Sequence, residues 1–80
     1  MYTLFTWFAD DEGGYSICRS EDFSPNLNYY PESGWRARPS VKIGDFNTFE
    51  ELVQLILLDS PCRLIEAEDE ARLLTSQIDF

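Results

Sequence analysis

One helical stripe constrains the fold of this chain more than any other feature. Apolar side chains fall at the i, i+3, i+4, i+7 spacing of an amphipathic helix, at Phe49, Leu52, Val53 and Ile56. Further leucines widen this face beyond what a surface helix needs, so the helix is expected to pack broadly against a sheet. Asn47, with Glu50 three residues later, predicts a capped start. Pro61, which lacks a backbone donor, predicts the end, so we expect a helix over residues 48–58.

The N-terminal half predicts a β-hairpin followed by a loop. Residues 2–9 are rich in aromatic and β-favouring side chains, which indicates a central or doubly covered strand. Residues 10–14 (Asp-Asp-Glu-Gly-Gly) supply turn residues, and alternation resumes over residues 15–20, so these two runs predict a hairpin. Residues 21–34 contain two prolines and keep no period, which predicts a long loop.

A further strand is predicted over residues 35–43, with one buried and one wet, basic face. The residues expected to be buried are Trp35, Ala37, Val41 and Ile43. The residues expected on the wet face are Arg36, Arg38, Ser40 and Lys42. Since Pro39 cannot donate to a ladder, this strand is expected at a sheet edge or with a bulge.

The C-terminal third predicts more extended structure. Residues 62–67 are interpreted as a strand that returns through the core. Residues 68–80 fit either a helix lined by Ala71, Leu74 and Ile78 or a final strand after an acidic turn, and we prefer the strand. The expected fold is therefore one α+β domain over residues 1–80, a small antiparallel sheet of four to five strands with one helix across it, in the order β-β-β-α-β-β.

Charge excludes several classes of ligand. Six Lys and Arg oppose fifteen Asp and Glu, which gives a net charge of −9 without any histidine. Phosphate binding depends on basic residues that release counterions, so direct binding of nucleic acid or of an anionic membrane is not expected. The N-terminus lacks the basic flank and cleavage site of a signal peptide, so we expect a cytoplasmic protein. Cys18 and Cys62 lie in separate apolar stretches and are expected to be reduced core residues.

The sequence contains little that indicates catalysis. Nucleophilic catalysis usually needs a histidine base, which the chain lacks, and the single lysine, Lys42, is predicted on a wet face. Two cysteines are too few for a zinc site. An EF-hand loop starting at Asp10 fails because Tyr15 occupies the sixth position, where glycine is required. We therefore expect a protein that is not an enzyme and binds no cofactor or metal.

Two acidic segments and two adjacent tyrosines are the candidate binding residues. The acids, expected at strand-end turns, are Asp10, Asp11, Glu12, Glu66, Glu68, Asp69 and Glu70. Such a negative patch fits a basic partner, although surface charge serves solubility equally well. The aromatic loop adds Tyr29 and Tyr30, which point in opposite directions if the segment is extended, so one should be exposed. Phe23 and Trp35 are expected to fold back over the core.

The segment Val41-Lys-Ile-Gly-Asp-Phe-Asn-Thr-Phe-Glu-Glu-Leu-Val-Gln-Leu-Ile56, followed by Cys62-Arg-Leu-Ile65, resembles a pattern of small acidic phage proteins. Among these it is similar to anti-CRISPR and other anti-defence inhibitors, in which a capped helix packs on a small antiparallel sheet. The resemblance covers about a third of the chain, and it assigns no functional role to any individual residue. It implies a stoichiometric inhibitor whose carboxylates occupy the basic DNA or RNA channel of a nucleic-acid-handling protein, such as a CRISPR effector. The alternative is an immunity protein or antitoxin that neutralises a basic nuclease toxin.

Overall fold

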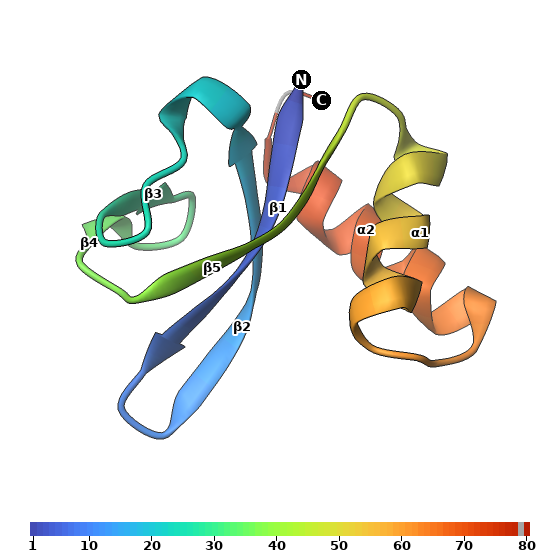
Figure 1. Cartoon of the computed structure of the whole chain (residues 1–80), viewed down its shortest axis with the longest axis horizontal. Coiled ribbons are helices and arrows are strands. Elements are labelled where there is room, and N and C mark those ends of the chain that lie inside the picture. Colours follow the sequence, from blue (N-terminus) through green and yellow to red (C-terminus); the bar gives the residue numbers. More distant parts are fainter. Residues whose placement is uncertain (79) are drawn as a thin grey trace.

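The computed structural model describes residues 1–78 and 80 and has an α+β fold (Figure 1). In chain order the elements are β1 (Tyr2–Ala9), β2 (Glu12–Arg19), the 3-10 helix η1 (Ser20–Asp22), β3 (Asn28–Tyr30), β4 (Gly34–Arg36), β5 (Ser40–Phe46), α1 (Phe49–Asp59) and α2 (Leu64–Ser76). A three-stranded antiparallel sheet has the order β2-β1-β5, and β3 and β4 form a separate two-stranded sheet. The α+β class is confirmed, but the expected order with a single helix is wrong because the described chain contains two helices.

The predicted β1–β2 hairpin is confirmed, with a tighter turn than expected. Ala9 pairs with Glu12, so only Asp10 and Asp11 form the turn, and Asp10 adopts a positive φ of 53°. Both glycines of the predicted turn lie within β2. Gly14 pairs with Trp7, and a Cβ at Gly14 would lie 3.2 Å from the Trp7 indole, so this position favours a residue without a side chain.

The predicted strand over residues 35–43 is interrupted. Residues 37–39, which include Pro39, separate β4 from β5, and a β-bulge shifts the β5 register opposite Leu4 and Phe5. Ser40, expected to be wet, is buried and donates its backbone N–H to the Pro25 carbonyl at 2.9 Å. The helices cover the other end of β5, toward Phe46 (Figure 1), which leaves Val41 59% exposed instead of buried.

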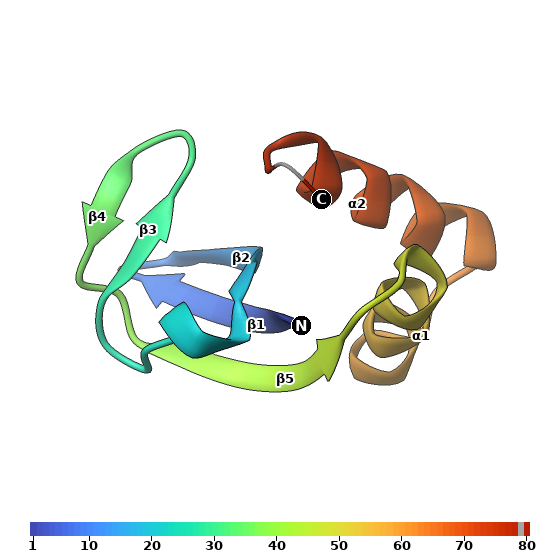
Figure 2. The same ribbon diagram turned by 90° about the horizontal axis from the view of Figure 1, so that it is seen from above.

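The predicted long loop over residues 21–34 is also partly wrong. It contains most of η1, all of β3 and the start of β4. Asn28 stabilises this segment because its buried side chain accepts from the Ser24 N–H at 2.9 Å and donates to the Ser24 carbonyl. The β3–β4 hairpin therefore forms a small layer on the face of the sheet opposite the helices (Figure 2).

Helix α1 begins one residue later than the capping pattern indicated. Thr48, not Asn47, is the N-cap, and its hydroxyl accepts from the Glu51 N–H at 3.2 Å. Glu51 in turn accepts from the Thr48 N–H at 3.0 Å, which completes a capping box. The end at Asp59, before Pro61, agrees with the prediction.

Helix α2 contradicts both C-terminal strand predictions. Residues 64–76 form a helix, and Cys62 and Arg63 belong to the connection from α1. Ala67, Ala71 and Leu74 are buried at the i, i+4, i+7 spacing of one helical face, and α2 packs on α1. The small alanines allow close packing of the helices, and their periodicity outweighs the β preference of the flanking residues.

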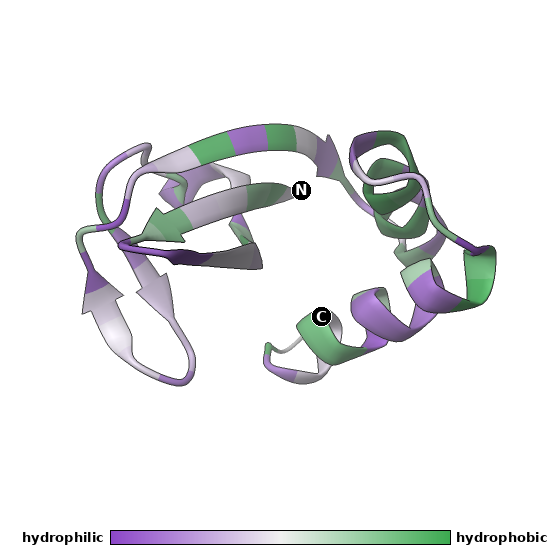
Figure 3. Ribbon diagram, turned by 90° about the horizontal axis from the view of Figure 1, so that it is seen from below, coloured by the Kyte–Doolittle hydropathy of each residue, from purple (hydrophilic) through white to green (hydrophobic). Residues whose placement is uncertain are grey.

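The sheet has a core on each face. On the helix side, a cluster that includes Leu4, Ile17 and Phe46 packs against both helices. On the other side, the Phe5 ring lies 5.2 Å from Phe23 and 6.2 Å from Tyr30. Figure 3 shows that hydrophobic residues make up most of α1 and that hydrophobic and hydrophilic residues alternate along β5.

Candidate functional site

Carboxylates dominate the polar surface, and most have no internal partner. Within residues 1–78 and 80, five acidic side chains form hydrogen bonds or ion pairs: Asp45, Glu51, Asp59, Glu66 and Asp69. Nine others form neither: Asp10, Asp11, Glu12, Glu21, Asp22, Glu32, Glu50, Glu68 and Glu70. The excess negative charge is therefore mostly available to a partner.

The acidic residues predicted between 66 and 70 lie on a helix, not at a turn. Glu66 pairs with Arg63 at 2.7 Å, and Asp69 pairs with Arg72 at 2.6 Å, both across one helical turn. All four partners are more than half exposed, so each pair is worth well under about 1 kcal/mol. The other two acids, Glu68 and Glu70, remain unpaired in the described chain.

The two predicted acidic segments do not form one patch. Asp10 and Asp11 form the turn at the far end of the β1–β2 hairpin, whereas Glu66 and Glu70 lie on α2. Figures 1 and 2 both show β1 running away from the helices toward this turn. A partner that contacts α2 is therefore not expected to contact the hairpin turn through the same small surface.

A different group of carboxylates is brought together by the fold. Asp45, Glu50 and Glu51 line one shallow hollow with Leu55, and Glu50 also lines an adjoining hollow with Glu68. We call these four acids the acidic helix surface: Asp45, Glu50, Glu51 and Glu68. They come from β5, α1 and α2. The second hollow also includes Leu64, which is 55% exposed and supplies an apolar contact beside the charges.

Sequence reasoning missed this surface because it depends on how α2 packs against α1. Glu50 and Glu51 lie in the first turn of α1, where acidic residues complement the helix dipole, and Glu51 also completes the capping box. Glu50, however, forms no hydrogen bond or ion pair in the described chain. The helical spacing of Ala67, Ala71 and Leu74 was the signal that could have placed Glu68 beside α1.

The two candidate tyrosines have opposite environments, as their alternation predicted. Tyr29 is 53% exposed, whereas Tyr30 is buried and therefore cannot contact a partner in this structure. Trp35, expected over the core, is instead 62% exposed and meets Tyr29 edge to face with ring centroids 5.7 Å apart. Phe23 does fold back, against Phe5.

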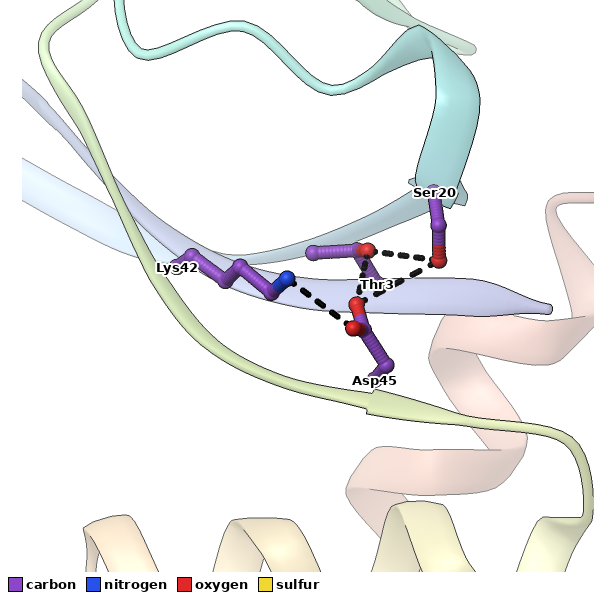
Figure 4. A network of polar contacts seen from close by, with 4 residues as sticks. All are labelled: Thr3, Ser20, Lys42 and Asp45. Atoms are coloured by element: carbon purple, nitrogen blue, oxygen red, sulfur yellow. Dashed lines mark hydrogen bonds and ion pairs between the residues drawn. The ribbon is translucent and has the colours of Figure 1, made fainter.

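A side-chain polar network joins β1, η1 and β5 (Figure 4). Thr3 and Ser20 hydroxyls both donate to Asp45 Oδ1, at 2.6 and 3.3 Å, and Lys42 Nζ lies 2.9 Å from Asp45 Oδ2. The hydrogen bond from Thr3, followed by that from Lys42, holds the pKa of Asp45 below its usual value of 3.8. Because Lys42 meets the carboxylate and not Ser20, this network does not contain the nucleophile and base pair of a serine–lysine dyad.

A second polar contact ties β2 to the end of α1. Tyr15 donates its phenol to Asp59 Oδ2 at 2.5 Å. Burial, and then the hydrogen bond and charge of Asp59, raise the pKa of Tyr15 to about 12. The neutral phenol therefore matches this position over the whole physiological pH range.

The cysteines differ from one another, and neither is paired. Cys18 is half-buried, and burial followed by the Asp22 charge raises the pKa of its thiol to about 11. Cys62 is exposed, so the expectation that it is a core residue is wrong.

The described residues contain no group of His, Cys, Asp and Glu arranged to hold a metal ion. Within the same residues, neither helix has the length and hydropathy needed to cross a bilayer.

Comparisons with known proteins give no relative from which a role could be transferred. No protein-family model, no curated protein and no solved structure matches the chain. The function must therefore be argued from the surface itself.

Proposed function

We propose that the protein is a small inhibitor that binds a basic, nucleic-acid-handling protein, in the manner of an anti-CRISPR protein. Its carboxylates would occupy positions where the partner otherwise holds phosphates. The observation that carries the proposal is the acidic helix surface, where carboxylates from three elements line adjoining hollows. Electrostatic complementarity of this kind accelerates association and excludes acidic partners.

The four acids of the acidic helix surface differ in the contacts that they make within the chain. This difference decides which of them can be replaced in a test. Glu51 completes the capping box and Asp45 anchors the β1–β5 network, so replacing either would disturb the fold. Glu50 and Glu68 form no internal hydrogen bond or ion pair in the described chain, and both face the hollow that contains Leu64. Their charge is therefore the part of the surface that a partner can use without cost to the fold.

The experiment compares two double variants that change the net charge equally. E50Q/E68Q neutralises the acidic helix surface, and D10N/D11N neutralises the hairpin turn at the far end of the sheet. Inhibition of target-DNA cleavage by the host's CRISPR effector, measured against inhibitor concentration, is the readout. Each exposed charge pair contributes roughly 0.2–1 kcal/mol, so we expect E50Q/E68Q, which removes two charges, to weaken inhibition about twofold to thirtyfold, and D10N/D11N to change it little.

Control measurements distinguish a loss of the binding surface from a loss of the fold. Circular dichroism should show that both variants fold, because none of the four side chains has an internal partner in the described chain. Full inhibition by folded E50Q/E68Q would refute the proposed surface. Absence of inhibition by the wild-type protein, combined with neutralisation of a nuclease toxin from the same cell, would replace the proposal with the immunity-protein alternative.

A further inference from the structure

β2 is an edge strand with an open hydrogen-bonding side. The sheet order β2-β1-β5 gives β2 one strand neighbour in the described chain. The Ser20 N–H donates to the Met1 carbonyl at 3.1 Å, which fixes the alternation of bonded and non-bonded pairs along β1 and β2. By that alternation, four residues direct their backbone N–H and C=O away from β1: Gly13, Tyr15, Ile17 and Arg19. These groups have no hydrogen-bond partner in the part of the chain that the structure describes.

Part of this open side of β2, at Ile17, borders a groove of about 520 Å³. Ile17 and Cys18 lie at the floor, between the two layers that cover the sheet. Tyr29 and Trp35, from the β3–β4 hairpin, line one side, and Ile78, after α2, lines the other. Figure 2 shows the β3–β4 hairpin and the C-terminal end of α2 on either side of β2. A strand added to β2 here would be covered on both of its faces.

The two walls differ in chemistry. Tyr29 and Trp35 are each more than half exposed, and aromatic faces attract cationic side chains. Asp22, an unpaired carboxylate, lies on the same side and is close enough to Cys18 to raise the pKa of its thiol. The opposite wall offers the apolar Ile78. Because side chains of a strand alternate between its faces, the groove fits a segment that alternates basic and apolar residues.

We propose that this groove binds an extended, basic segment of a partner protein by strand addition to β2. Charge selects this occupant over a second copy of the chain, which would bring another net charge of −9 to the same edge. The C-terminal Phe80 is not the occupant, because its ring packs 5.2 Å from Tyr2 and 5.9 Å from Phe46. This inference concerns a surface other than the acidic helix surface and does not depend on the proposed inhibition.

The test uses a defined peptide with both ends blocked. The probe alternates Arg and Val over about six residues, the usual length of a strand. Its control alternates Glu and Val, which preserves length and strand propensity but reverses the charge. Fluorescence anisotropy should show that the Arg peptide binds at least about tenfold more tightly than the Glu peptide. Equal binding of the two peptides would overturn the charge selection.

Arg19 allows the backbone contribution to be isolated. Its φ of −64° already suits proline, so R19P removes the outward N–H without backbone strain or loss of a β1 hydrogen bond. R19A removes the same charged side chain but keeps the N–H. We expect R19P to bind the Arg peptide about tenfold more weakly than R19A, since a hydrogen bond is lost and the ring obstructs the added strand. Equal affinities of the two folded variants would contradict strand addition.

A measurement on the wild-type protein keeps the proposal falsifiable if R19P does not fold. In a ¹⁵N NMR titration with the Arg peptide, the largest shifts should fall on the Ile17 and Arg19 amides and the Trp35 indole. Shifts confined to α1 and α2, or no shifts, would overturn the assignment. Sedimentation tests whether a second copy of the chain occupies the groove instead. Self-association that R19P abolishes would show this, and would overturn the proposal of a basic partner segment.

Discussion

Replacing Tyr15 with phenylalanine tests the contact that joins the sheet to the helices. The phenol donates to Asp59 at 2.5 Å from the middle of β2 to the end of α1, so Tyr15→Phe removes a link between the layers with little change in shape. A hydrogen bond to a charged group contributes about 1.5–3 kcal/mol, but this one is partly exposed, so we expect a loss of about 1 kcal/mol at neutral pH. For a domain of this size that loss corresponds to a Tm decrease of about 4–8 °C.

The pH dependence provides an independent check of the same contact. Since the Tyr15 pKa is raised from 10.0 to about 12 in the folded protein, the unfolded chain loses this proton first as the pH rises. The contribution of the phenol is therefore complete below pH 10.0 and disappears as the pH approaches about 12. Urea unfolding at several pH values should show the wild-type advantage over Tyr15→Phe shrinking across this interval.

Tyr29→Phe is the matched control. Tyr29 is exposed and its hydroxyl has no hydrogen bond in the described chain, so this variant should leave the free energy of unfolding unchanged at neutral pH. A Tyr15→Phe variant as stable as the wild type, or a stability deficit that persists undiminished in alkali, would refute this role of the Tyr15–Asp59 hydrogen bond.

Three further predictions concern other parts of the molecule. An alkylating reagent at neutral pH should label Cys62 rapidly and Cys18 slowly, because Cys62 is exposed whereas burial raises the Cys18 pKa to about 11; equal rates by mass spectrometry would be inconsistent with this difference. Asp45→Asn should destabilise the protein at neutral pH, and its deficit should shrink as the pH falls below 3.8, because the lowered pKa gives the carboxylate a contribution that protonation removes; a pH-independent deficit in denaturant unfolding would contradict it. Leu52→Ala, at a fully buried position, should cost about 2–5 kcal/mol, whereas Leu58→Ala, at an 81% exposed position of the same helix, should cost much less; similar losses in urea unfolding would refute the packing of α1.

Local patterns in the sequence were sufficient for the hairpin and for α1. Residues 2–9 and the turn residues that follow them indicate a hairpin regardless of the remaining chain, and the apolar stripe that begins at Phe49 defines α1 before Pro61. Helix α2 could not be assigned in the same way. Its buried face begins with Ala67 and Ala71, whose small side chains give a weak hydrophobic signal, and its acidic residues resemble a solvated turn. The i, i+3 spacing of Asp69 and Arg72, which form an ion pair on α2, is the local helical signal that was missed.

The candidate surfaces depend on contacts that sequence patterns do not contain. Alternation predicted that either Tyr29 or Tyr30 would be exposed, but the pairing of Tyr29 with Trp35 requires the β3–β4 register. The groove beside β2 similarly requires segments from opposite ends of the chain, and the meeting of Glu50 with Glu68 requires the packing of two helices. Long-range packing therefore brings together the residues of both surfaces, whereas composition predicts only the sign of their charge.

Competition with DNA tests most directly whether the carboxylates replace phosphates. A host CRISPR effector bound to the labelled protein is titrated with its double-stranded target DNA, and release of the label is measured at low and at high salt. We predict that DNA displaces the wild-type protein completely, and that E50Q/E68Q is displaced at about twofold to thirtyfold lower DNA concentrations than D10N/D11N. A stable complex that holds DNA and the protein together, or equal displacement of the two variants, would contradict the account.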